Sequence, residues 1–358
     1  MKGENMGRLV KLLGAIITGV IIMALGSYFW YQNAVAIPNG LSTELEVFAV
    51  EKGQGVETIA EKLVEQGFVA NKLALQIYLK LNPGLANSIQ AGSFELSTSM
   101  SIVEIVEKLQ KATDLDYVKL TIPEGMRYDE IAEKAATVFA GKNEAKFVES
   151  EFIAIAEAPD STTFNSKVTA FLQKYKPAGK NLEGFLYPET YFFKPDTTAL
   201  AVIEKLISTL EEKVITANVI TAAHLEKYSF YEYLTIASII ERETFTLEEK
   251  PLIADIYFRR LEQGVQGVKL LQADATLTYI VKDWKADVFP LKTNKSPYNT
   301  YLYPGLPPTP ISNPGLVAIK ASVNPEANDY WYYIHDNDGV VHYAKTLAEH
   351  NENSRKYL

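Results

Sequence analysis

Residues 233–244 read YLTIASIIERET, and the rest of the chain is organised around this stretch. Residues 233–240 carry no charge, and Glu241, Arg242 and Glu243 then follow in direct succession. An apolar run of this length fits a buried helix, although it also fits a short strand. The stretch therefore predicts an element that begins in the protein core and ends at a cluster of charges.

Glu241 is the first candidate for chemistry in this stretch. On a helix, Leu234, Ala237, Ser238 and Glu241 share one face, because steps of three, four and seven residues return to the same side. Glu243 points elsewhere, since residues two apart do not face each other. A carboxyl group held against apolar surface tends to keep its proton near neutral pH, as a general acid must. The alternative is that both glutamates are ordinary surface charges at a helix end.

The composition excludes several classes of function. The 358 residues include no cysteine, so disulfides, thiolate metal sites and a cysteine nucleophile are excluded. The formal net charge is −9 and no basic stripe is visible, so we expect no nucleic-acid partner. The four histidines lack the His-x-x-x-His spacing of a helical zinc site, and we predict neither a metal nor a cofactor.

The N-terminus predicts a membrane anchor. Residues 12–30 carry no charge, and at about 1.5 Å per residue such a helix approaches the ~30 Å hydrocarbon core of a bilayer. Arg8 and Lys11 flank one end, and the aromatic residues 28–31 form the other. The positive-inside rule predicts a single-pass protein of the cytoplasmic (inner) membrane, with residues 1–31 as cytoplasmic tip and anchor and the rest extracytoplasmic. The alternative is a signal peptide cleaved after residues 34–36.

The next segment, residues 46–112, predicts a small module. The pattern gives a strand (47–50), helices (56–66 and 72–81), a returning strand (91–96) and a further helix (101–109) with a capping box. This order resembles a LysM module, a fold that binds the N-acetylglucosamine backbone of cell-wall glycans. The alternative is a spacer of the same shape.

Residues 117–358 predict a mixed α+β domain, so the fold class of the whole chain is α+β. We expect helices at 142–160, 197–215, 247–262 and 318–324, and a hairpin pairing 331–335 with 340–344. Residues 303–315 hold seven prolines and glycines and predict a stiff, irregular wall.

Four stretches together resemble the YceG/MltG family of endolytic murein transglycosylases. They are GFLYPETY (184–191), ASIIERET (237–244), SPYNTYLYPGLPP (296–308) and HYAKTLAEHN (342–351), in the family's order and spacing. The resemblance implies a YceG-like catalytic domain over residues 117–358 and carries Glu241 over as the catalytic acid.

The resemblance also implies a substrate-binding set in a glycan cleft. Asp274 matches a Gln-x-Asp-Pro-Thr segment, although Ala275 stands where proline is usual, and residues 264–268 make the preceding loop longer than usual. The substrate-binding residues expected are Tyr187, Glu189, Ser238, Gln272, Asp274, Tyr298, Asn299, Thr300 and His342.

The implied reaction cuts the β-1,4 bond between N-acetylmuramic acid and N-acetylglucosamine in peptidoglycan and leaves a 1,6-anhydro end. Since the nucleophile belongs to the substrate, one acid suffices. A muramidase would need a second carboxylate, roughly 5 Å away if retaining or 6.5–9.5 Å if inverting, and Asp274 or Glu189 could serve.

A non-catalytic scaffold that binds the wall and recruits synthases is the alternative from another class. The resemblance also implies wall-elongation synthases and penicillin-binding proteins as partners, but no residue identifies that interface.

Overall fold

The computed structural model describes residues 2–43, 45–111 and 117–358, with their side chains except those of 2–13 and 15. The chain forms two compact units, Met1–Val118 with Phe192–Lys194, and Lys119–Tyr191 with Pro195–Leu358. Residues 112–116, where the boundary between the two predicted extracytoplasmic domains falls, lie outside the described residues.

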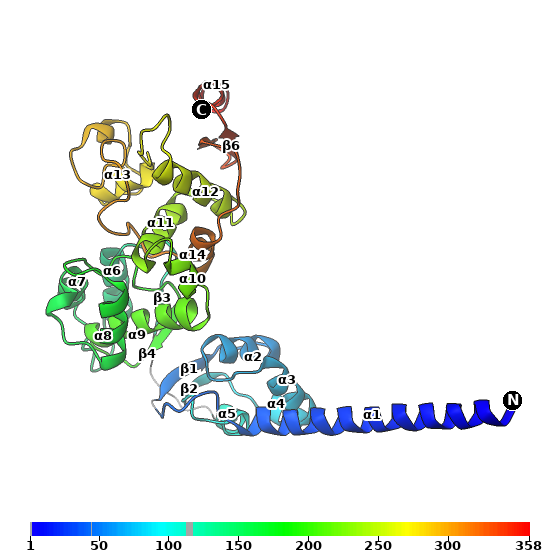
Figure 1. Cartoon of the computed structure of the whole chain (residues 1–358). Helices are drawn as coiled ribbons and strands as arrows, with labels where there is room; N and C mark the ends of the chain where they lie inside the picture. Colours follow the sequence, from blue (N-terminus) through cyan, green and yellow to red (C-terminus); the bar gives the residue numbers. More distant parts are fainter. Residues whose placement is uncertain (1, 44, 112–116) are drawn as a thin grey trace. The chain divides into compact units, whose positions relative to one another are not determined.

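The first unit contains the predicted strand–helix–helix–strand order (Figure 1). Strand β1 pairs antiparallel with β2, so that Phe48 faces Phe94, and both rings are buried in the core. The elements of this unit are α1 (Lys2–Ala36), β1 (Glu46–Val50), α2 (Val56–Glu65), α3 (Lys72–Leu81), α4 (Pro83–Asn87), β2 (Gly92–Leu96) and α5 (Ile102–Leu109). The predicted capping box of Ser101 and Glu104 is confirmed at the start of α5. The likeness to a LysM module stays a prediction.

Helix α1 has two environments along its length. Near its end, Val35 is buried, and Tyr31 and Ala34 pack against the core of the first unit. Before that, large apolar side chains between Ile16 and Trp30 are exposed. Within the described residues, no helix has the combination of length and apolar character needed to cross a bilayer. The anchor, and the topology inferred from it, stay predictions.

The second unit is mainly helical. Its predicted hairpin is confirmed as β5 (Tyr332–His335) paired with β6 (Val341–Ala344). The remaining two-stranded sheet of the chain pairs β3 (Val118–Thr121) with β4 (Thr190–Phe193). The longer helices are α6 (Tyr128–Phe139), α7 (Glu149–Glu157), α8 (Ser166–Tyr175), α9 (Ala199–Leu210), α11 (Phe230–Glu243), α12 (Glu249–Glu262), α13 (Asp274–Ile280), α14 (Leu316–Val323) and α15 (Leu347–Tyr357). Shorter pieces are η1 (Pro159–Ser161), η2 (Glu211–Thr216), α10 (Ala222–Leu225) and η3 (Pro290–Thr293). The mixed α+β class is confirmed.

The helix predicted over 142–160 is wrong at both ends. It begins only at Glu149 and ends at Glu157, and Pro159 starts a separate turn. Glu144 lies in the left-handed region with φ 62°, which a continuous right-handed helix does not allow.

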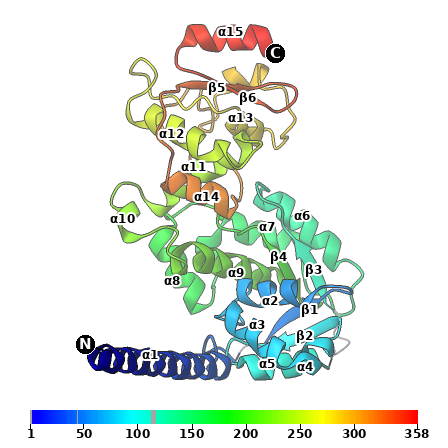
Figure 2. The same ribbon diagram turned by 90° about the vertical axis from the view of Figure 1, so that its right-hand side faces the viewer.

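Helix α11 is the central element of the second unit, and α14 lies alongside it in both views (Figures 1 and 2). A capping box of Ser229 and Glu232 starts the helix, and every residue from Phe230 to Ile240 except Glu232 is buried. The strand alternative for this stretch is therefore excluded. The stiff segment before α14 docks on the helix, because the Ser238 hydroxyl accepts from the Ile311 amide at 3.0 Å.

A buried carboxyl group ties three distant segments of this unit together. Glu183 is fully buried and accepts hydrogen bonds from the Tyr128 amide and the Asn313 side chain, each at 3.0 Å. The Tyr279 hydroxyl lies 3.1 Å from its other oxygen. Burial raises the pKa of Glu183 to about 8, so the group is largely protonated at neutral pH.

Replacing Glu183 with Gln should flatten the pH dependence of thermal stability. The pKa of Glu183 is about 8 in the folded protein and 4.5 as its ordinary value. The resulting contribution to folding stability is fully present below pH 4.5 and is lost as pH rises through 8. At ~1.4 kcal/mol per pKa unit, the effect is on the order of a few kcal/mol. Thermal unfolding between pH 4.5 and 8.5 should show a smaller fall in Tm for Glu183→Gln than for wild type. Parallel curves would contradict the assignment.

Candidate active site

Three consecutive charged side chains leave the end of α11 in different directions. Successive residues of a helix project about 100° apart, so Glu241, Arg242 and Glu243 each meet a different part of the fold. Their neighbours distinguish a structural charge from a catalytic one.

Glu241 is held in a buried ion pair. Its Oε1 lies 2.8 Å from the Lys250 ammonium, and its Oε2 accepts the Gly315 amide at 3.1 Å. The two side chains are only 8% and 5% exposed. The helical stripe thus predicted burial correctly, but the expected apolar surroundings of this carboxyl group are wrong, because its immediate partners are a cation and an amide donor.

Glu124, which no sequence motif singled out, belongs to the same group of charges. Its carboxyl group lies so close to Gly315 that a Cβ there would come within 1.7 Å of it. Partial burial, followed by the charge of Glu241, raises the pKa of Glu124, and Lys250 opposes that rise. The charge of Glu189 also raises the pKa of Glu124, so this predicted cleft residue lies near the group that contains Glu124 and Glu241.

Glu243 has the environment that a general acid needs. Its Oε1 accepts the Ala275 amide at 2.8 Å and its Oε2 accepts the Tyr333 hydroxyl at 2.7 Å. Burial, and then the charge of Asp274, raises the pKa of Glu243, while the Ala275 amide, Tyr333 and Arg260 oppose the rise. The carboxyl group is thereby biased towards its protonated form.

Glu243 also lines a cavity of about 470 Å³, a size typical of ligand sites. Predicted residues Gln272 and Asp274 line the same cavity, and the Asp274 carboxylate accepts the Tyr301 hydroxyl at 2.5 Å. Basic and aromatic side chains complete the wall, among them Arg260, Lys292, Tyr332, His335 and His350. The cavity thus combines two carboxyl groups, cations and rings at the charged end of α11.

Backbone strain marks the segment that brings these groups together. Gln272 has φ 53°, a conformation that costs free energy in a residue other than glycine and that persists where its surroundings fix it. The Gln272 amide donates to the Thr300 carbonyl at 3.1 Å, and the Ala273 amide donates to the Thr300 hydroxyl at 3.0 Å. Such strain accompanies functional sites and is consistent with one here.

Several predicted substrate-binding residues have internal roles instead. Ser238 and Asn299 are fully buried and Thr300 is 1% exposed, so none offers a surface to a glycan. The Asn299 side chain donates to three carbonyl oxygens of residues 291–294, including that of Asn294 at 2.7 Å. These residues shape the loops around the cavity.

The remaining predicted residues lie outside the set that lines this cavity. Tyr187 is buried and its carbonyl accepts the Tyr191 hydroxyl, while Tyr298 bonds the Thr309 hydroxyl at 2.8 Å. His342 pairs with Asp336 at 2.8 Å and stacks on Tyr357.

Two other histidines line the cavity. His335 bonds Glu249 at 2.9 Å. His350 has a buried Nδ1 for which the described residues supply no hydrogen-bond partner. Among the described residues, no group of three or more His, Asp or Glu side chains is arranged to hold a metal ion.

Comparisons with known proteins agree with the resemblance seen in the sequence. The model of the YceG-like family matches residues 48–356. The chain belongs to the YceG-like family. A relative from Bacillus subtilis (strain 168), named endolytic murein transglycosylase, is 29% identical over 94% of this chain and 91% of its own length. A relative of the same name from Streptococcus pneumoniae serotype 2 (strain D39) is 28% identical, and the matched region covers 96% of this chain and 65% of that protein.

A solved structure gives the same family. The crystal structure of a putative YceG-like protein from Listeria monocytogenes is 29% identical to this YceG-like chain, with a TM-score of 0.55. The similarity covers 87% of this chain and 99% of that one. The prediction that the chain is an enzyme of the lytic transglycosylase class is confirmed at the level of the family.

Glu243 and Lys250 were not among the site residues expected from the sequence, yet Glu243 lines the cavity and Lys250 pairs with Glu241. Both glutamates lie in the ASIIERET stretch, and only the folded arrangement shows which one reaches Gln272 and Asp274. Lys250 had one available signal, a lone cation that follows two glutamates at the start of an amphipathic helix, but that pattern is common on protein surfaces.

The backbone amide of Ala275 donates a hydrogen bond that a proline at this position could not make. Replacing Ala275 therefore tests whether Glu243 is the catalytic acid. Ala275→Pro removes the amide that donates to Glu243, at the second helical position of α13, where proline is tolerated. Because that hydrogen bond lowers the pKa of Glu243, its loss should raise the pKa and move the alkaline limb of kcat/KM to higher pH. Tyr333→Phe should shift the limb in the same direction. Unshifted profiles in folded variants would exclude Glu243 as the acid.

Proposed function

We propose that this protein is a membrane-anchored endolytic peptidoglycan transglycosylase that uses Glu243 as its general acid and base. It cuts the bond between N-acetylmuramic acid and N-acetylglucosamine within nascent glycan strands. The observation that carries the assignment is the placement of Glu243, with a raised pKa, in the cavity that also holds Gln272 and Asp274. Family membership supports the reaction class.

The proposed reaction needs only one catalytic carboxyl group. Protonated Glu243 gives its proton to the glycosidic oxygen as the bond from that oxygen to the muramyl C1 breaks. The resulting carboxylate takes the proton of the muramyl C6 hydroxyl, whose oxygen bonds to C1. The products are a 1,6-anhydro-muramyl end and a free N-acetylglucosamine hydroxyl, and Glu243 regains its proton.

Glu241 remains the competing assignment, and its contacts support a structural role. A carboxylate paired with Lys250 and bonded to the first residue before α14 links three helices at one point. Removing one partner of such a buried pair typically costs ~3–5 kcal/mol, whereas removing both charges is often neutral. This difference allows the two roles to be separated.

Paired variants should decide which glutamate is the acid. Glu243→Gln should lower cleavage by about 10²–10⁴-fold with the fold intact. Glu241→Gln alone should lower Tm, and the double variant Glu241→Gln/Lys250→Met should recover both stability and cleavage. Mass spectrometry of digested peptidoglycan measures the products. A folded double variant without activity, beside an active Glu243→Gln, would return the role to Glu241.

A muramidase that hydrolyses the same bond is the second candidate, because Asp274 lines the cavity with Glu243 and could act as a second carboxylate. The same digestion separates the two. A transglycosylase leaves anhydro-muramyl products, and a hydrolase leaves products heavier by one water.

The membrane anchor is also part of the proposal, supported by the charge-free residues 12–30 and by the exposed apolar side chains between Ile16 and Trp30. In cells, the full chain should stay in the membrane fraction during alkaline carbonate extraction and be released by detergent. A chain beginning at residue 32 should be soluble. Since the protein has no cysteine, a single Thr43→Cys variant should react with an impermeant maleimide from outside. Labelling only after lysis would contradict the topology.

A further inference from the structure

Arg242, between the two glutamates, has an unusual environment. Its guanidinium lies over the ring of Trp284, with Cζ 3.9 Å from the ring centroid. Its Cδ and Nη1 lie 3.1 and 3.2 Å from the position that a Cβ on Gly125 would take, so the chain at that glycine backs the guanidinium closely. In the part of the chain that the structure describes, Arg242 makes no ion pair or hydrogen bond, and its Nε is buried without a partner.

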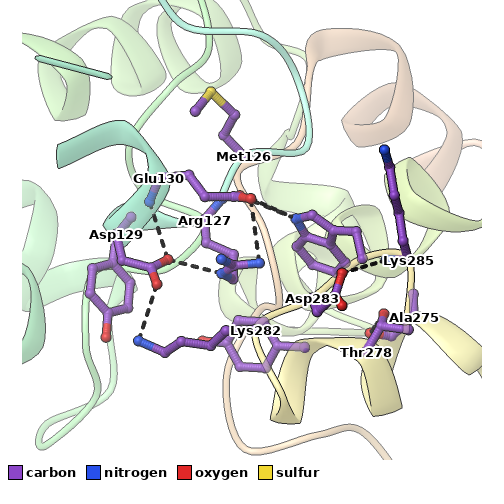
Figure 3. Close-up of polar contacts among 12 residues, drawn as sticks. Met126, Arg127, Asp129, Glu130, Ala275, Thr278, Lys282, Asp283 and Lys285 are labelled. Carbon is purple, nitrogen blue, oxygen red and sulfur yellow. Dashed lines mark hydrogen bonds and ion pairs between the residues drawn. The ribbon is translucent and has the colours of Figure 1, made fainter. Parts of the chain in front are cut away.

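Two neighbouring cations, Arg127 and Lys282, are paired with carboxylates (Figure 3). Arg127 pairs with Asp129 at 2.9 Å and with Glu130 at 3.4 Å. Lys282 pairs with Asp129 at 3.1 Å. The indole itself is fixed, because its Nε1 donates to Glu130 at 3.0 Å. Arg242 therefore has a rigid support, but no carboxylate of the described residues lies within ion-pair distance of it.

An unpaired guanidinium in this position carries a cost. Burial, together with the charge of Arg127, lowers the pKa of Arg242, while the charges of Glu130 and Glu241 oppose that change. Withdrawing a cation from water without a partner is unfavourable. The planar fork of arginine is suited to two parallel hydrogen bonds with a carboxylate, and stacking on an indole holds that fork in place. Arg242, held in place on Trp284, thus has the features of an anion-binding site.

The position of this pair relates it to the cavity of Glu243. Helix α13 begins at Asp274 beside Glu243, and Trp284 lies four residues beyond its end at Ile280. Arg242 directly precedes Glu243 in α11 and projects from another side of it, and a helix with its side chains is about 10 Å across, so an anion on Arg242 would lie on the order of 10 Å from the acid. A group carried by the sugar next to the scissile bond is within such a reach.

We propose that Arg242 and Trp284 form a subsite for a carboxylate carried by the muramyl portion of the glycan strand. The inference rests on the proposed function for the identity of the ligand. Two sources share this chemistry: the lactyl carboxylate, which is free in strands without peptides, and the carboxylates of the stem peptide. Arg242 is a binding residue in this proposal and takes no part in proton transfer.

Binding to the inactive Glu243→Gln protein tests the subsite without cleavage. The probes are soluble strands with free stem carboxylates, the same strands with amidated stems, peptide-free strands, and chitin oligosaccharides, which carry no carboxylate. Adding Arg242→Gln should weaken binding of the carboxylate-bearing probe by about 10–100-fold, the effect of losing charged hydrogen bonds. Chitin binding should not change. The peptide-free and amidated strands show which carboxylate is recognised.

Two further variants control for charge and for folding. Arg242→Lys keeps the charge but not the fork, so it should lose affinity several-fold while keeping the Tm. Lys285→Gln removes an exposed cation of the same region and should leave every Kd unchanged. Equal losses for chitin and for the carboxylate probes, or no loss in folded Arg242 variants, would overturn the subsite. If wild type cleaves nothing while carboxylate binding still depends on Arg242, the proposed function fails and the subsite stands.

Discussion

The second unit depends on how the charged end of α11 is accommodated. The helix is buried on every side for most of its length, yet its last turn carries two acids and one base in succession. Burying charges together in one place would cost several kcal/mol per ion, so each needs separate compensation. Glu241 pairs with a lysine and accepts a backbone amide, and Arg242 stacks on an aromatic ring. Glu243 accepts hydrogen bonds from two neutral donors and lines a cavity.

These three solutions have different chemical consequences. The contacts of Glu241 fix the position of its carboxyl group and connect α11 to α12 and to the start of α14. The carboxyl group of Glu243 lies beside that of Asp274, whose charge favours the protonated form of Glu243. A pair of carboxyl groups with divergent environments is the usual sign that one is structural or electrostatic and the other exchanges protons.

The elements of the fold could be predicted from the sequence far better than the site. Periodicity, caps and turn residues are local, which is why β1, α2, α3, α5 and the final hairpin matched their predicted ranges closely. The choice between Glu241 and Glu243 is not local. It depends on Lys250 of the next helix and on Ala275 and Tyr333, which are 32 and 90 residues from Glu243.

The family motif likewise could not show which of its residues contact the cavity. The expected set around Asp274 contained residues that touch the cavity, such as Gln272, and residues that only support it, such as Thr300. A motif records both kinds together, because a mutation in either would disturb the site. Burial and hydrogen bonding separate them, since a fully satisfied, fully buried side chain cannot bind a ligand without leaving its partners unpaired.

The departure from the motif at Ala275 gives the strongest physical argument about the acid. A backbone amide aimed at a carboxylate stabilises the charged form, and this opposes the effects of burial and of Asp274. A catalytic group that must both donate and recover a proton works best when these influences nearly balance near the operating pH. At Glu243, burial and Asp274 raise the pKa of the carboxyl group and the Ala275 amide lowers it. The presence or absence of that one amide therefore changes how readily Glu243 gives up its proton.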